Sequence, residues 1–175
     1  MQYSTIKTPP QEYSSGNIIS RFIDGLAFRY FWATEGLTEL DLLFKPSESG
    51  MSTNETLEHM VWLSVMIKNT IEGGVSDRSI NQTLKGIPFN ESRSLVLENL
   101  GTASQQARSK TVSELESLQV IIKSGENEYP YPLWNMMSGP LADALYHTGQ
   151  IVSFRRSSGN PIPKGVNHLA GKGPF

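Results

Sequence analysis

The sequence predicts an all-α protein built as a four-helix bundle, with a small hairpin before the last helix. Three observations lead to this fold class. Apolar residues recur at intervals of three and four over long segments, which is the spacing of amphipathic helices. Capping boxes stand where some of these segments begin, and glycine and proline interrupt the chain between them. We expect the four helices near residues 16–35, 53–72, 91–108 and 134–157.

The first helix is expected to be buried on two sides. Between Gly16 and Thr34, one apolar stripe at helical spacing is joined by a second. A polar connection with Pro46 and Gly50 follows. The first stripe comprises Ile19, Phe22, Ile23, Leu26, Ala27 and Tyr30, and the second comprises Phe28, Phe31 and Trp32.

The second helix begins at a capping box formed by Ser52 and Glu55 and ends at Gly73–Gly74. Its two apolar stripes differ, because the second contains a histidine. Burying an imidazole without a partner costs about 1–3 kcal/mol, so His59 must have a hydrogen-bond or metal partner. The first stripe comprises Leu57, Met60, Val61, Ser64, Ile67 and Ile71, and the second comprises His59, Trp62, Leu63 and Met66.

The third helix is preceded by a polar loop over residues 75–90, with Asn90 as its expected cap. Thr111 and Glu114 form a capping box for a further short helix. Residues 120–122 and 128–129 flank KSGEN and predict the hairpin, in which Pro130 and Pro132 exclude a central strand. The third helix has a thin stripe of Val96, Leu100, Ala103 and Ala107.

The stretch from Trp134 to Gly159 is expected to form one long helix that carries the chemistry. Asp143 and His147 are four residues apart, so their side chains share a face with Cβ atoms roughly 5–6 Å apart. A carboxylate and an imidazole in this arrangement can hold one cation between them. Gln150 continues this face.

We predict that His59, Asp143 and His147 bind a divalent metal ion and that water completes its coordination. Taken alone, His59 would more often be a buried histidine hydrogen-bonded to a neighbour, and the other two a local carboxylate–imidazole pair. Together they match the way facing helices of a bundle build metal sites. Three protein ligands with an open position are typical of catalytic sites. Gln150 would orient the metal-bound water or thiol or a substrate, or it would hydrogen-bond the metal carboxylate.

Other side chains have weaker assignments. Trp62, Tyr146 and Phe154 lie on the stripes that carry the ligands and could wall a pocket, although such aromatics are more commonly core. His168 lies in a Gly/Pro-rich tail and is expected to be solvated. Arg155 and Arg156 are expected to be C-terminal cations favoured by the dipole of their own helix.

Composition limits the remaining classes. We expect one domain, with an arm over residues 1–15, the bundle over 16–160 and a tail over 161–175. The absence of cysteine excludes disulfides, a thiol nucleophile and thiolate ligands. A net charge of −2 argues against a nucleic-acid partner. No run of 18 apolar residues and no secretory signal is present, so we expect a cytoplasmic protein with no membrane partner.

Two segments, NETLEHMVW and DALYHTGQIVSFRRSSGNP, resemble the DinB/YfiT superfamily of four-helix bundles. That family carries one histidine on its second helix, and a His-x-x-x-His pair followed by Arg-Gly-Gln on a late helix. The resemblance spans Gly16 to Pro161. His59 and His147 fall on two of the histidine positions, whereas Asp143 stands at the third and Thr148 replaces the arginine.

The resemblance implies a metalloprotein that commonly forms a homodimer, in a family known for induction by DNA damage. It favours nickel or zinc, and a His₂/carboxylate set also suits iron or manganese. Characterised relatives include thiol transferases and proposed hydrolases. We therefore expect a metal-dependent thiol S-transferase or hydrolase acting on a small-molecule substrate, with a low-molecular-weight thiol as one candidate. The alternative is a non-catalytic metal-binding or oligomerising bundle.

Overall fold

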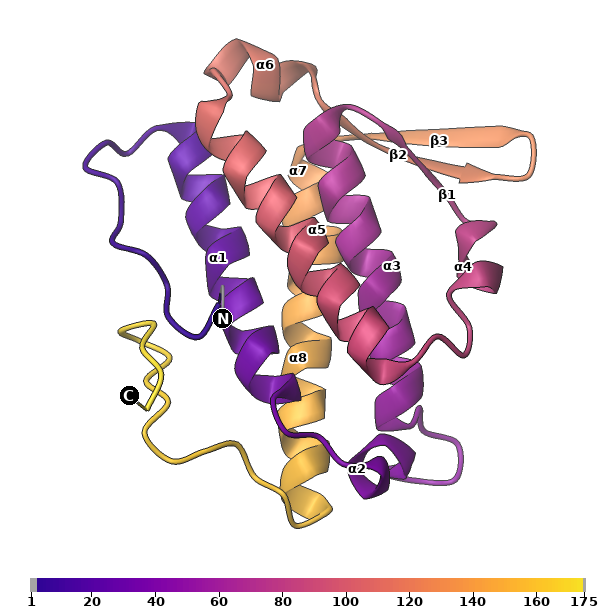
Figure 1. Cartoon of the computed structure of the whole chain (residues 1–175). Helices are drawn as coiled ribbons and strands as arrows, with labels where there is room; N and C mark the ends of the chain where they lie inside the picture. The colour runs from indigo at the N-terminus through magenta and orange to yellow at the C-terminus, as the bar shows by residue number, and fades with distance from the viewer. Residues whose placement is uncertain (1–2, 175) are drawn as a thin grey trace.

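Four long helices form the bundle in the computed structural model, which describes residues 3–174. They are α1 (Ser15–Thr34), α3 (Thr53–Glu72), α5 (Phe89–Ser109) and α8 (Ala142–Ser157). Helix α5 packs against α1 and α3, and α8 packs against the same two helices (Figure 1). The predicted four-helix bundle is therefore present, together with a small sheet. None of the helices in residues 3–174 is long and apolar enough to cross a bilayer.

Helices α3 and α5 run in the same direction, so the connection between them has to return along the length of the bundle (Figure 1). This connection contains strand β1 (Val75–Asp77) and the short helix α4 (Ile80–Thr83). Helix α3 ends where Gly73 adopts a left-handed conformation, with φ of 73°. Glycine takes up this conformation without steric cost, so it releases the chain from the helix.

A three-stranded sheet with the order β1-β2-β3 lies at one end of the bundle. Strands β2 (Gln119–Ser124) and β3 (Asn127–Pro132) form the predicted hairpin, which projects away from the helices (Figure 1). Strand β1 pairs in parallel with β2. The prediction of a polar loop over residues 75–90 is therefore wrong for the residues of this strand. Its three residues are too few to show an alternating pattern. The protein is thus mostly but not wholly helical.

The capping boxes place two helix starts correctly and a third box was missed. Ser52 caps α3, and Thr111 caps α6 (Val112–Ser117), as expected. Helix α5 instead begins at Phe89 directly after Pro88, so the prediction of Asn90 as its cap is wrong. The missed box joins Thr38 to Asp41.

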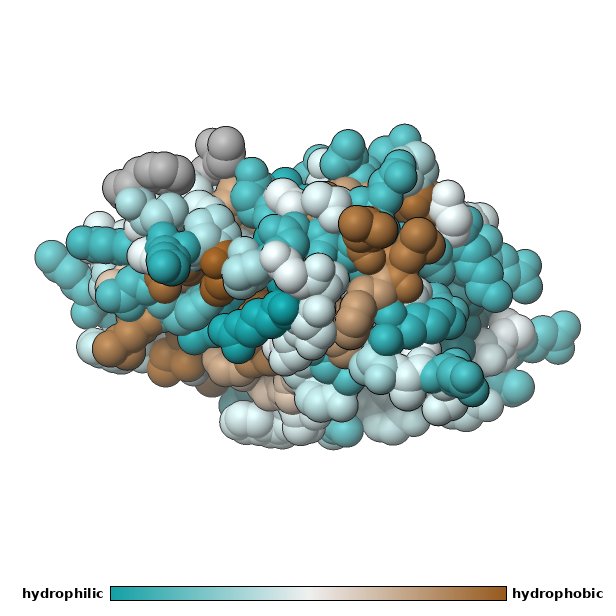
Figure 2. Space-filling view, turned by 90° about the horizontal axis from the view of Figure 1, so that it is seen from below, coloured by the Kyte–Doolittle hydropathy of each residue, from teal (hydrophilic) through white to brown (hydrophobic). Residues whose placement is uncertain are grey.

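That missed box begins helix α2 (Glu39–Leu43), within the connection expected to be irregular. Asp41 turns inward, whereas Leu40 and Leu43 are 78% and 75% exposed. Figure 2 looks at the molecule from the α2 end and shows apolar side chains at the surface there.

The stretch expected as one helix over 134–157 is broken. It consists of α7 (Trp134–Met136), a π-helical segment η1 (Met137–Leu141) and α8. Gly139 leaves the helical region, with φ of −98° and ψ of −108°, and Pro140 follows it. Proline lacks an amide hydrogen and its ring disturbs the preceding turn, so the helix axis changes direction here. Asp143 and His147 both lie after the break.

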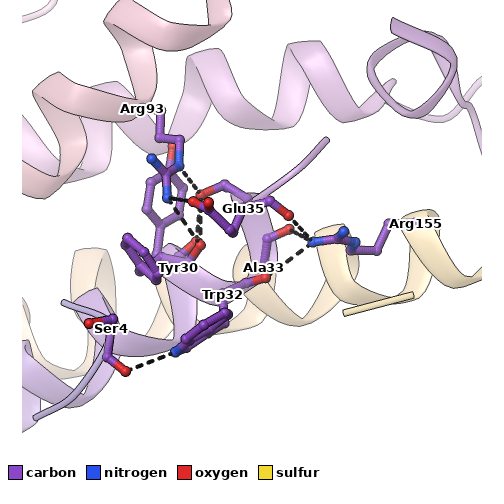
Figure 3. Close-up of polar contacts among 9 residues, drawn as sticks. Ser4, Tyr30, Trp32, Ala33, Glu35, Arg93 and Arg155 are labelled. Atoms are coloured by element: carbon purple, nitrogen blue, oxygen red, sulfur yellow. Dashed lines mark hydrogen bonds and ion pairs between the residues drawn. The ribbon is translucent and has the colours of Figure 1, made fainter. Parts of the chain in front are cut away.

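The chain ends before and after the bundle pack on each other and on α1. The Ile6 amide donates to the Gly171 carbonyl at 2.8 Å. The Trp32 indole donates to the Ser4 carbonyl at 3.2 Å (Figure 3). A Cβ atom added to Gly173 would lie 2.6 Å from the Trp32 ring, so only glycine fits this contact. The arm and the tail therefore cover one side of α1.

Arg155 joins α8 to the C-terminal end of α1. Its side chain is buried, and its Nη1 donates to the carbonyls of Trp32, Ala33 and Glu35 at 3.0–3.1 Å (Figure 3). Helix α1 has no basic residue in its last turn. Arg155 lies in the last turn of α8 with Arg156, as expected. Its side chain in addition satisfies free carbonyls at the end of another helix, which the sequence did not predict.

Replacing Arg155 by Met should lower the free energy of unfolding by about 3 kcal/mol, because buried carbonyls would lose a charged donor. Arg156→Met is the matched control, since Arg156 is adjacent and exposed, and it should change stability by less than about 0.5 kcal/mol. Urea unfolding measures both. Equal losses in the two variants would contradict the capping role.

Asp41 links α2 to the residues that follow α8. It accepts hydrogen bonds from Thr38, Ser158 and Asn160. Burial alone would raise the pKa of this carboxyl, but these hydrogen bonds outweigh burial and lower the pKa to about 2. The charged form is thus the one that the fold stabilises.

Because the pKa of Asp41 is lower in the folded chain than in the unfolded chain, its contribution is complete above about pH 4. It is lost as the pH falls towards 2. We expect Asp41→Asn to be less stable than the parent protein by about 2 kcal/mol at pH 6, with the gap narrowing by pH 2.5. Urea unfolding at the two pH values checks this. A gap of constant size would show that the charge of Asp41 is not what stabilises the contact.

Candidate metal centre

Two facing helices bring the three predicted ligands together. His59 lies on α3, and Asp143 and His147 lie on α8. His59 Nε2 is 3.2 Å from Asp143 Oδ2, and His147 Nε2 is 3.3 Å from Asp143 Oδ1. One ligand atom from each residue lies within 4.8 Å of the other two. The carboxylate thus stands between two imidazoles.

The π-helical break sets the direction from which Asp143 enters the site. Asp143 is the second residue of α8, directly after the turn that contains Gly139 and Pro140. His147 follows one turn later, so the two side chains share the face that meets α3. The rings of His59 and His147 meet edge to face, with centroids 4.8 Å apart.

The site is open on one side. The His147 side chain is 12% exposed, whereas those of His59 and Asp143 are 34% and 44% exposed. His147 is thus held within the protein, and the other two side chains reach solvent. A small molecule can approach Asp143 without any rearrangement of the helices.

The hydrogen bond with Gln150 determines which nitrogen of His147 carries the proton and which one can act as a ligand. Gln150 Oε1 lies 2.7 Å from His147 Nδ1, and Gln150 Nε2 donates to the Tyr146 hydroxyl at 3.1 Å. An amide oxygen only accepts hydrogen bonds, so Nδ1 of His147 carries the proton. In the neutral imidazole, Nε2 then presents a lone pair to the Asp143 carboxylate. That contact requires either a second proton on His147 or a cation between the two groups.

The residues fit a divalent cation. Ligand atoms at 2.0–2.1 Å from a tetrahedral zinc ion lie about 3.4 Å apart. Each imidazole nitrogen lies at about that separation, 3.2 or 3.3 Å, from a different oxygen of Asp143, and one ligand atom from each of the three residues lies within 4.8 Å of the others. Two imidazoles and one carboxylate form a mixed donor set that suits zinc, nickel, iron or manganese. Gln150 supplies the outer hydrogen bond that orients a metal-bound histidine. The contact of Gln150 is thus with the His147 ring and not with the Asp143 carboxylate.

The three aromatic residues expected to wall a pocket lie in different surroundings. Trp62 is 8% exposed and belongs to the core. Phe154 is also 8% exposed and packs on Phe44, with ring centroids 5.7 Å apart. Tyr146 is 63% exposed and stands beside the metal ligands.

A groove of about 560 Å³ runs from Asp143 and Tyr146 to the base of the hairpin. We call it the hairpin groove. Among the described residues its lining includes neither Trp62 nor Phe154. The hairpin groove is lined by Leu63, Met66, Val120, Ile122, Tyr131, Asn135, Ser138, Gly139, Pro140, Ala142, Asp143 and Tyr146.

His168 is separate from this centre and is not solvated as expected. It is half-buried in the tail and meets Phe28 edge to face, with ring centroids 5.9 Å apart. Burial lowers the pKa of His168, and the nearby Arg29 and Arg156 lower it further. Within residues 3–174, the group of side chains that could hold a metal ion consists of His59, Asp143 and His147 and does not include His168.

Sequence reasoning missed the contribution of the hairpin to the site. Leu63 and Met66 were recognised on the stripe of His59, but nothing local to 119–132 shows that Val120 and Ile122 face them. The available signal is that Val120 and Ile122 are two residues apart in a strand, which places both on one face of β2.

Replacing Gln150 by Leu should weaken zinc or nickel binding about 10- to 100-fold, because His147 would lose the partner that fixes its ring. Tyr146→Phe keeps that partner and removes only its outer contact, so it should have a smaller effect. Calorimetric titration of the metal-free protein with each ion measures both. Unchanged affinity in Gln150→Leu would show that Gln150 does not support the ligand.

Comparison with known proteins identifies the fold. A scan of protein families found no match, and a search of curated proteins found none either. Among solved structures, a DinB-like protein from Bacillus subtilis, YjoA, aligns with a TM-score of 0.58. The alignment covers 83% of this chain and 95% of that one, at 14% identity. The resemblance stated from the sequence is therefore supported at the level of structure, and this chain has the DinB-like fold.

Proposed function

We propose that the protein is a divalent-metal-dependent enzyme that acts on a small molecule with a metal-activated water or thiol. The observation that carries the proposal is the arrangement of His59, Asp143 and His147. In the neutral form of His147 a nitrogen lone pair faces the Asp143 carboxylate, and a cation between them would satisfy both.

The number of ligands favours catalysis over a structural role. Structural zinc sites are closed by four protein ligands, whereas catalytic sites keep a position for water or substrate. Within residues 3–174 the cluster offers three, and Asp143 remains 44% exposed. A divalent ion at such a site lowers the pKa of a bound water or thiol, which supplies a nucleophile at neutral pH.

The chain's own residues would hold and orient the reactants. His147 is fixed by Gln150, and Gln150 is in turn held by the Tyr146 hydroxyl. The Tyr146 hydroxyl uses an oxygen lone pair in that contact, so its own hydrogen is free to be donated. Tyr146 is exposed at the hairpin groove and can donate to a substrate bound beside Asp143. Nickel and zinc are the ions that we propose first.

The decisive test combines metal content with turnover. Tag-free protein should contain about one zinc or nickel ion per chain by elemental analysis. His59→Ala and His147→Ala should lose that ion. Unchanged metal content in both variants would contradict the site. Metal-loaded protein should then be assayed with p-nitrophenyl esters for hydrolysis, and with chlorodinitrobenzene plus a low-molecular-weight thiol for S-transfer.

Asp143→Asn is the matched variant for activity, because it keeps the shape of the side chain and removes its charge. We expect it to lower metal affinity and to abolish turnover, with little change in the melting temperature of the metal-free protein. A chain that unfolds when the metal is chelated would instead show that the ion is structural. In that case the non-catalytic reading of the bundle is correct.

A further inference from the structure

The hairpin groove begins at Asp143, which is the member of the candidate metal centre found among its described lining residues, and it continues along one stripe of α3. His59, Leu63 and Met66 are spaced four and three residues apart, so they lie on one face of that helix. Leu63 and Met66 line the groove. They form its floor, one and two turns beyond His59, and are themselves only 2% and 7% exposed.

The hairpin supplies the opposite wall. Val120 and Ile122 are two residues apart on β2, and Tyr131 is the partner of Val120 on β3. All three line the groove, because residues paired across strands share a face of the sheet. The groove is thus bounded by α3, by the hairpin and by the turn at Gly139–Pro140.

Charge is confined to one end of the groove. Among the described residues that line the groove, Asp143 is the one whose side chain is charged at neutral pH. The hydroxyl of Tyr146 lies at the same end, and Asn135 and Ser138 are exposed at the rim. A ligand segment that carried several charges would find no partner here, whereas an uncharged apolar segment would cover the accessible parts of Ile122 and of the Tyr131 and Tyr146 rings.

We infer that the substrate is an amphiphile whose polar head lies at the metal beside Asp143 and whose uncharged apolar tail occupies the hairpin groove. This inference rests on the proposed function and adds the substrate class to it. A volume of about 560 Å³ falls in the range of small-molecule sites. The same chemistry disfavours thiols with several carboxylates, because their charged bodies would have to occupy this groove.

Alkyl hydroxamates test the inference, since the hydroxamate head chelates the metal and the chain length varies independently. Acetohydroxamate, butanohydroxamate, hexanohydroxamate and octanohydroxamate are titrated into the zinc-loaded protein by calorimetry. With methylenes about half buried, Kd should fall roughly twofold for each methylene. The fall should amount to about tenfold or more from acetohydroxamate to hexanohydroxamate, and should level off once the groove is filled.

Ile122→Asp places a charge in the groove and should remove the dependence on chain length while leaving the Kd of acetohydroxamate unchanged. Ile121→Asp is the matched control, because it puts the same charge on the opposite face of β2 and should keep the dependence. Ala142→Phe is a second test that does not disturb the sheet. Ala142 is exposed at the start of α8, so a larger side chain fills the groove from its rim.

The outcomes separate the two proposals. Equal Kd values along the series, with acetohydroxamate still bound, would overturn the apolar-tail inference and leave the metal centre intact. A chain-length dependence that survives both Ile122→Asp and Ala142→Phe would place the tail elsewhere and overturn it as well. A protein that binds neither zinc nor acetohydroxamate would overturn the proposed function and this inference together.

Discussion

The buried guanidinium of Arg155 fixes the arrangement on which the bundle depends. The last carbonyls of a helix have no partner within that helix, and burying them unpaired is costly. Arg155 reaches from α8 to three such carbonyls at the end of α1. From the other side, Arg93 of α5 donates to the Thr34 hydroxyl and forms an ion pair with Glu35 (Figure 3). Helices α5 and α8, which both pack on α1, are thereby anchored to the same end of it.

This anchoring has a direct effect on the candidate site. Arg155 and His147 are two turns apart on the same helix, so holding Arg155 sets how far α8 is displaced along the bundle. His59 is carried by α3, whose start is held by its own capping box. A shift of one helical turn would move His147 about 5.4 Å and separate it from His59. The alignment of the ligands is therefore maintained by polar contacts at the opposite end of the helix.

The sequence was sufficient for features that depend on neighbours in the chain. The capping boxes at Ser52 and Thr111, the hairpin and the shared face of Asp143 and His147 all follow from short-range spacing. What it did not reveal depends on contacts between distant segments. Strand β1 exists because β2 pairs with it more than forty residues later. The dipole argument placed Arg155 at the end of its own helix, but it could not show that the guanidinium reaches the carbonyls of Trp32 and Ala33 on α1.

His59 illustrates where the boundary lies. Its place among apolar residues required a partner, and the identity of that partner emerged only because α3 and α8 are adjacent. The break at Gly139–Pro140 could be read as a weak point of the helix, since proline disturbs the turn before it. The opening of a groove at this turn depends on the hairpin packed above it, which no local pattern encodes. The homodimer and the cytoplasmic location stay predictions.

The two prolines of β3 have a consequence for how the protein behaves among its own copies. Strand β3 is the outer strand of a hairpin that extends into solvent, and an outer strand normally offers amide hydrogens to any other strand that arrives. Pro130 and Pro132 are two residues apart, so both missing amide hydrogens belong to the same side of the strand. With β2 on the inner side, it is the free side that has lost them. The wall of the groove is thus kept from recruiting further strands, and the hairpin can stand clear of the bundle without seeding aggregation.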